Sequence, residues 1–137
     1  MSLILDSSVT AAWIYGDETT DPVRHVLSLV TMSGAWVAGL WRVEIANILE
    51  MGLRRRRTEA AFRDATLADL ALLPIQIDQE MNHHAWSTTL QLAERHRLTL
   101  YDAAYLELAL RRRLPLATLD MELRSAASAE KVVLLGM

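Results

Sequence analysis

The sequence predicts an α/β protein with a central parallel sheet of four to five strands, and three observations lead to that fold class. Short apolar runs alternate with longer segments of helical periodicity, which is the pattern of βαβ units. Hydrophobic residues make up 52% of the chain and charged residues only 23%, so a sizeable core is available. The 137 residues are enough for one core but too few for two, so residues 1–137 are expected to form a single domain.

Local signals define the first four elements. The apolar run at residues 2–5 predicts the first strand, and a helix at residues 7–15 follows it. Asp21-Pro22 begins a second helix that runs to Met32, because proline is favoured in the first helical turn. Residues 34–38 then predict a short second strand.

Two amphipathic helices are expected before the third strand. The helix at residues 41–54 has an apolar face that should be buried. That face consists of Trp41, Ile45, Ile48, Leu49 and Gly52. Thr58 is the expected cap of the next helix, which runs to about Leu72, and residues 74–77 predict the third strand.

The last part of the chain predicts a central helix between two strands. Asp78 is first expected to cap a long helix with Met81 and Leu92 on its apolar stripe. Residues 101–112 then form a helix that is apolar nearly all round and therefore central. The remaining elements are a strand, a short helix and a strand at residues 114–118, 121–127 and 132–135.

Composition excludes several classes of protein. There is no cysteine, so a disulfide framework and a thiolate zinc site are both excluded. The N-terminus lacks the pattern of a signal peptide, and no apolar run approaches the roughly 20 residues of a membrane helix. We therefore expect a cytoplasmic protein with no membrane contact. The net charge of −3 argues against coating nucleic acid by bulk electrostatics.

Arginine is nevertheless concentrated in two runs, at residues 54–57 and 111–113. The ordinary interpretation is that both runs end helices, where cations favour the negative end of the helix dipole. Arginine also binds phosphate groups through two parallel hydrogen bonds, so a role in guiding phosphates stays open.

Four acidic residues, Asp6, Glu44, Asp102 and Asp120, occupy comparable positions at the ends of elements. Asp6 and Asp120 directly follow predicted strands, where ligands of parallel sheets bind. Glu44 flanks an apolar helix stripe, and Asp102 lies in the first turn of the central helix. Two carboxylates ~4 Å apart repel by about 4 kcal/mol at an effective dielectric constant of about 20. A shared cleft would therefore favour a divalent cation.

Each acid also has an ordinary structural interpretation. Asp6 and Asp120 are in positions to cap helices, and Thr99 to Asp102 matches a capping box. Capping alone, however, does not require acids at the same end of two strands, nor a carboxylate beside a buried stripe. The joint pattern favours a site.

Four segments that contain these acids resemble the motifs of PIN-domain ribonucleases, especially the VapC-like toxins of type II toxin–antitoxin systems. The segments are Leu3-Ile4-Leu5-Asp6-Ser7-Ser8-Val9, Leu40–Leu49, Leu98–Tyr105 and Leu114–Asp120. They occur in order and with family-like spacing over nearly the whole chain. Ala38 and Met121 depart from the pattern, where many relatives have proline and a basic residue.

The resemblance implies a three-layer α/β/α fold and a metal site. Asp6, Glu44, Asp102 and Asp120 match the metal-binding acids of the family. Ser7, Asn47 and Thr118 match polar residues near them. Ligands that are all oxygen atoms favour Mg²⁺ or Mn²⁺ over zinc.

The expected activity is metal-dependent hydrolysis of RNA by an endoribonuclease, with single-stranded or looped RNA as substrate. The resemblance further implies a cognate antitoxin and a homodimer. The alternative is a non-catalytic binding module whose acidic cleft docks a basic peptide. The sequence leaves open which RNA is cut, whether one or two metal ions bind, and which carboxylate orients the attacking water.

Overall fold

The computed structural model describes all of residues 1–137 and contains a five-stranded parallel sheet. The strand order is β3-β2-β1-β4-β5. The strands are β1 (Leu3–Leu5), β2 (Ala35–Val37), β3 (Ile75–Ile77), β4 (Leu116–Ala117) and β5 (Leu134–Leu135). Each lies within a predicted apolar run, so the predicted α/β class and the five strands are confirmed.

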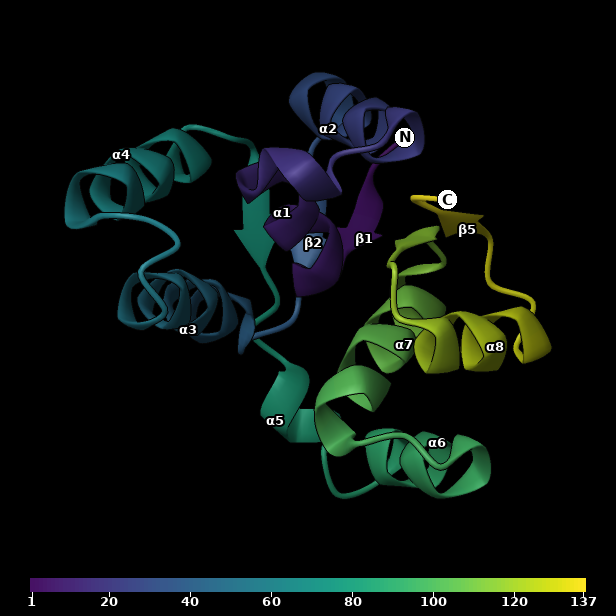
Figure 1. The fold of residues 1–137 in the computed structure, drawn as a ribbon. Helices are drawn as coiled ribbons and strands as arrows, with labels where there is room; N and C mark the ends of the chain where they lie inside the picture. Colours follow the sequence, from purple (N-terminus) through teal and green to yellow (C-terminus); the bar gives the residue numbers. More distant parts are fainter.

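Helices cover both faces of this sheet, as the three-layer prediction requires. Figure 1 shows α1 to α4 on one side and α6 to α8 on the other. The helices are α1 (Ser7–Ile14), α2 (Asp21–Ser33), α3 (Trp41–Arg54), α4 (Ala60–Ala71), α5 (Met81–His84), α6 (Thr88–His96), α7 (Leu100–Arg112) and α8 (Met121–Ala129). A 3₁₀ turn, η1 (Gly16–Glu18), follows α1.

The core explains why β1 and α7 are so apolar. All three residues of β1 are at most 1% exposed, because helices cover this central strand on both faces. Seven consecutive residues of α7, Ala103 to Ala109, are buried, so the prediction of a central helix is confirmed. Since α7 contacts β1 and β4, any residue in its first turn lies near the carboxyl ends of these strands.

Two predicted helix caps are wrong. Glu59, and not Thr58, occupies the N-cap position of α4, and the Thr58 hydroxyl is buried without a hydrogen-bond partner. Asp78 does not begin a long helix, because α5 ends at His84 and a turn separates it from α6.

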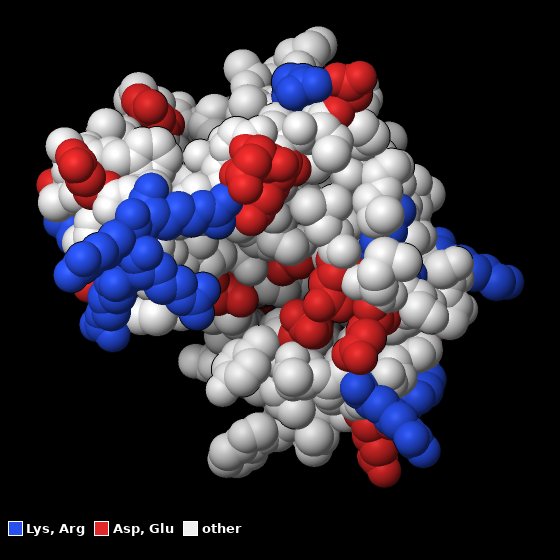
Figure 2. Space-filling view, in the orientation of Figure 1, with Lys and Arg blue, Asp and Glu red and all other residues white.

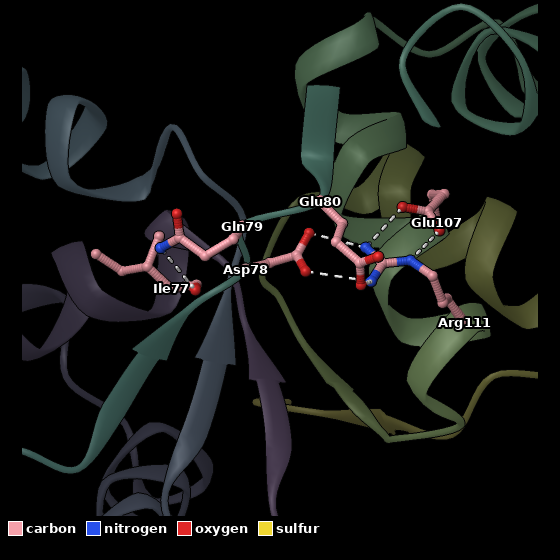
Figure 3. Close-up of polar contacts among 6 residues, drawn as sticks. All are labelled: Ile77, Asp78, Gln79, Glu80, Glu107 and Arg111. Carbon is pink, nitrogen blue, oxygen red and sulfur yellow. Dashed lines mark hydrogen bonds and ion pairs between the residues drawn. The ribbon is translucent and has the colours of Figure 1, made fainter. Parts of the chain in front are cut away.

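Asp78 instead pairs with Arg111 of α7, as Figure 3 shows. The Arg111 Nη2 atom lies 2.8 Å from Asp78 Oδ2, and Nη1 lies 3.1 Å from Oδ1. The Arg111 Nε atom donates to Glu107 at 2.7 Å. A buried carboxylate without a cationic partner costs more free energy than a helix without a side-chain cap. Asp78 therefore pairs with Arg111 and does not cap a helix, contrary to the prediction from its local sequence.

Two arginines of the second run are thus engaged inside the fold. Besides the Arg111 ion pairs, the Arg112 guanidinium lies 3.3 Å from the centre of the Trp36 ring. Arg113 ends α7 in a left-handed conformation. These contacts favour the structural interpretation of Arg111 and Arg112 over phosphate guiding, whereas the Arg113 side chain is exposed.

The chain changes direction across the sheet between β1 and β4. From β1 it proceeds to β2 and β3 on one side, and it later returns to β4 and β5 on the other. Ligands of open parallel sheets bind at such a switch point, beyond the carboxyl ends of the strands. No helix in the structure has the length and hydropathy needed to span a bilayer.

Candidate functional site

Asp6 lies at the switch point itself, immediately after β1. Its backbone N–H donates to Ala117 O of β4 at 3.0 Å, which fixes the residue between the two strands. Its side chain is nearly buried, and Oδ2 accepts hydrogen bonds from Ser8 Oγ and Thr118 Oγ1, both at 2.7 Å. Burial raises the pKa of Asp6, the two hydroxyls oppose this, and nearby Asp120 adds to the rise.

The two hydroxyl groups also organise the link between β4 and α8. Ser8 Oγ accepts from the backbone N–H of Leu119 at 2.9 Å, and Thr118 Oγ1 accepts from that of Asp120 at 3.1 Å. Thr118 was predicted near the site, whereas Ser8 was missed. Ser7, which was predicted, lies 3.4 Å from Asp6 Oδ1 and makes the weaker contact.

Asp120 caps α8 with one carboxylate oxygen, and the other oxygen takes no part in the cap. Its Oδ1 atom accepts from the backbone N–H of Leu123 at 2.9 Å, so the capping interpretation is correct. The cap also fixes the side chain at the carboxyl end of β4. A capping role and a role in a site are therefore compatible.

Asp102 is held in the first turn of α7 by its backbone. Its N–H donates to Thr99 Oγ1 at 3.1 Å, while no hydrogen bond ties its carboxylate to the Thr99 amide. The predicted capping box is thus only half formed, and the Thr99 hydroxyl partly opposes the rise in the pKa of the Asp102 carboxyl. Burial raises the pKa of Asp102 to about 6, and the charges of Asp120 and Asp6 contribute to the shift.

Glu44 reaches the same region from α3 and is half-buried, as its position beside the apolar stripe predicted. Tyr105 Oη of α7 donates to Glu44 Oε1 at 2.5 Å. Burial raises the pKa of Glu44, the Tyr105 hydrogen bond lowers it, and the charges of Asp6 and Asp102 raise it again.

Tyr105 was missed by the sequence analysis, because it looks like one more apolar residue of a buried helix. Burial and the Glu44 charge raise its pKa well above the usual range, so the phenol stays protonated. It is therefore a permanent hydrogen-bond donor to Glu44. The only sequence signal for its role is that a tyrosine, which carries a hydroxyl donor, occurs within a helix that is otherwise apolar.

The four predicted acids thus come together from four separate elements. Figure 2 shows acidic side chains gathered in a central hollow, with basic side chains beside it over the region of α3. None of the four makes an ion pair with an arginine, lysine or histidine. The charges of neighbouring acids contribute to the raised pKa values of Asp6, Glu44 and Asp102.

This donor set suits a hard divalent cation. All available ligand atoms are carboxylate or hydroxyl oxygens, the type that Mg²⁺ and Mn²⁺ prefer. No group of three or more acidic or histidine side chains has the geometry of a complete metal site. The fit is therefore to an ion held directly by one or two carboxylates and through water by the others, as is usual for Mg²⁺.

Asn47, the third polar residue predicted near the site, is exposed. It lies one turn after Glu44 on α3, in a groove between α1 and α3. It makes no hydrogen bond to the acids, so its predicted role near the substrate stays a prediction.

Comparison with known families agrees with this arrangement. The family model for the PIN domain matches residues 3–129. The chain belongs to the PIN-domain family. PIN domains are generally nucleases, and they generally use divalent metal ions.

Solved structures show the same PIN fold. PAE2754 from Pyrobaculum aerophilum aligns with a TM-score of 0.71 and 21% identity, over 98% of this chain and 83% of that one. FitAcB from Neisseria gonorrhoeae aligns with a TM-score of 0.67 and 15% identity, over 98% of this chain and 96% of that one. VapBC2 from Rickettsia felis, bound to a DNA fragment from their promoter, aligns with a TM-score of 0.64 and 13% identity. The alignment covers 98% of this chain and 97% of that one. No curated protein sequence gave a significant match.

Proposed function

We propose that this PIN domain is a metal-dependent endoribonuclease and the toxin of a toxin–antitoxin pair. One observation carries the proposal. Four carboxylates from the β1–α1 link, α3, α7 and the β4–α8 link lie close enough for their charges to interact, with no basic side chain to neutralise them. Maintaining this repulsion in a folded protein is costly, so it favours a function that brings a cation to the site.

In this proposal the acids have different roles in binding the metal ion and orienting the water. Asp6, held by two hydroxyl donors, is the best fixed ligand. Asp120 has one oxygen engaged in the α8 cap and the other available. Asp102 or Asp120 would orient the attacking water. When bound, Mg²⁺ or Mn²⁺ would activate that water and neutralise charge on the phosphate oxygens.

Two further parts of the proposal rest on resemblance. The four motifs are similar to those of VapC-like toxins, and VapBC2 is among the structural neighbours. We therefore expect a cognate antitoxin protein that blocks the acidic site, a homodimer and a cytoplasmic location. Single-stranded or looped RNA is the expected substrate, because such RNA presents splayed bases and accessible phosphates.

The decisive experiment compares Asp6→Asn with wild type on several single-stranded and looped RNAs. Cleavage by wild type should require Mn²⁺ or Mg²⁺ and stop with EDTA. Asp6→Asn is nearly isosteric and should reduce cleavage by about 100-fold or more, because a charged ligand is lost. Asp102→Asn should behave similarly.

Asp69→Asn is the matched control, since Asp69 is an exposed acid of α4 that makes no ion pair. It should cleave like wild type, and circular dichroism should show all variants folded. Metal-dependent cleavage retained in both Asp6→Asn and Asp102→Asn would contradict the proposal. Binding of a basic peptide, with no cleavage of any RNA by wild type, would favour the non-catalytic alternative.

A further inference from the structure

A groove of about 300 Å³ runs between α1 and α3, next to the acidic site. The two helices approach closely along it, and Tyr15 Oη donates to Ile48 O at 3.3 Å. Its lining includes Ala11 of α1 and Asn47, Met51 and Arg55 on or just after α3. Its lining also includes Ile48 and the ion pair between Glu18 and Arg57, so the groove has both apolar and charged walls.

The groove lies one helical turn beyond Glu44, because Asn47, which lines it, follows Glu44 by three positions on α3. α1 starts at Ser7, directly after Asp6, and Glu44 lies in the first turn of α3. Glu44, Asn47, Met51 and Arg55 follow one another at intervals of three or four residues, so they lie along one face of the helix. The eleven residue intervals from Glu44 to Arg55 correspond to about 16 Å along the axis.

Free positive charge lies at the far end of the groove. Arg55 and Arg56 are exposed and make no ion pair, unlike their neighbours. Arg54 pairs with Glu50, and Arg57 pairs with Asp17 and Glu18. The Arg57 guanidinium also lies 3.8 Å from the centre of the Tyr15 ring, which makes it part of the groove wall.

We propose that this groove binds the sugar–phosphate backbone of single-stranded RNA on one side of the cleaved phosphate. The Asn47 amide and the Arg55 guanidinium would donate to phosphate oxygens, while Met51 and Ala11 contact the ribose or base. The inference rests on the proposed function, because it supplies the path by which that substrate reaches the acids.

Charge explains why such a path is needed. The acidic centre repels a polyanion, so attraction must come from elsewhere on the same surface. Arg111 and Arg112 are engaged in the fold and exposed Arg113 lines a different pocket, whereas Arg55 lines this groove. Guanidinium groups suit phosphate through paired hydrogen bonds, and an RNA strand can span the distance between Arg55 and Glu44.

The test measures binding without cleavage. Fluorescence anisotropy of a labelled single-stranded RNA is recorded for full-length Asp6→Asn protein in EDTA, over a series of salt concentrations. Adding Arg55→Gln should weaken binding about three- to tenfold at low salt and reduce the salt slope by about 0.7, the value for one phosphate contact. Met51→Glu should weaken it at least as much, because it places a carboxylate in the groove.

Arg113→Gln is the matched control. Arg113 is also exposed, makes no ion pair and carries the same charge, but it lies at the end of α7 remote from the groove. Its affinity should equal that of the Asp6→Asn parent. Equal losses for Arg55→Gln and Arg113→Gln, or no loss for Arg55→Gln and Met51→Glu, would overturn the inference.

The two proposals fail in different ways. If the groove inference is wrong but the function correct, wild type cleaves RNA with metal while Arg55→Gln binds like the parent. If the function is wrong, wild type cleaves nothing, whatever the effect of Arg55→Gln on binding.

Discussion

At the scale of single residues, the site is organised by hydroxyl groups and not by cationic side chains. Ser8 and Thr118 donate to Asp6, and Tyr105 donates to Glu44. Hydroxyl donors orient a carboxylate without cancelling its charge, whereas an arginine would form an ion pair and compete with a metal ion. These hydroxyl groups therefore fix the Asp6 and Glu44 carboxylates without supplying a positive charge.

Tyr105→Phe should weaken Mn²⁺ binding about tenfold, because the donor that fixes Glu44 Oε1 is lost while the ring stays in place. Mn²⁺ affinity can be measured by electron paramagnetic resonance, independently of any cleavage assay. Tyr101→Phe, an exposed tyrosine on the same helix, is the control and should bind Mn²⁺ normally. Identical affinities for both variants would show that Tyr105 does not position Glu44.

At the scale of elements, the position of α7 decides the position of Asp102 and Tyr105. Arg111 joins α7 to the end of edge strand β3 through Asp78, and Glu107 on α7 shares the same guanidinium (Figure 3). The Asp78 and Glu107 side chains are only 1% and 4% exposed. Two buried carboxylates thus depend on one arginine.

Arg111→Met should lower the free energy of unfolding by about 3–5 kcal/mol, since it leaves both buried carboxylates without their cation. Urea denaturation followed by circular dichroism measures this change. Arg54→Met removes only an exposed pair with Glu50 within α3 and should cost about 0.5 kcal/mol or less. A loss for Arg111→Met no larger than this control would contradict the proposed role of the ion pairs.

At the scale of the whole molecule, the charge distribution matters more than the net charge of −3. Uncompensated acids gather at the carboxyl ends of β1 and β4, while free arginines lie beside them at the end of α3 (Figure 2). In the proposed function, a polyanion would be attracted by one region and would reach the other only when a cation reverses the negative charge there. The same repulsion makes the stability of the metal-free protein depend on pH.

The pKa of Asp102 is raised from 3.8 to about 6, so the folded protein binds more protons than the unfolded chain between these values. Its stability should therefore fall as the pH rises through this window. In EDTA, Asp102→Asn should stabilise the protein above pH 6 by about 1 kcal/mol, a value reduced for solvent screening. The gain should shrink as the pH falls from about 6 to about 4 and be absent below that.

Thermal unfolding at a series of pH values checks this expectation, with Asp69→Asn as the control. Saturating Mn²⁺ should remove the advantage of Asp102→Asn at pH 7.5, because the ion relieves the repulsion in wild type. A variant that is no more stable than wild type at any pH would show that Asp102 is not under electrostatic strain.

Local patterns determined most of the fold and the candidate acids. Apolar runs such as residues 2–5 and 34–38 predict strands, and aspartates that follow strands indicate the carboxyl edge of a sheet. Both signals involve neighbours in the sequence, so no tertiary information is needed to detect them. The family motifs extend the same local information to the order of the acids along the chain.

The tertiary structure alone decided the partners. Tyr105 and Glu44 are 61 residues apart, and Arg111 and Asp78 are 33 apart. No local rule distinguishes a tyrosine that donates to a carboxylate from one that only fills space, or an arginine that ends a helix from one that neutralises buried acids. Packing of α7 against the sheet brings these groups into contact, because which side chains meet depends on how whole elements pack and not on local periodicity.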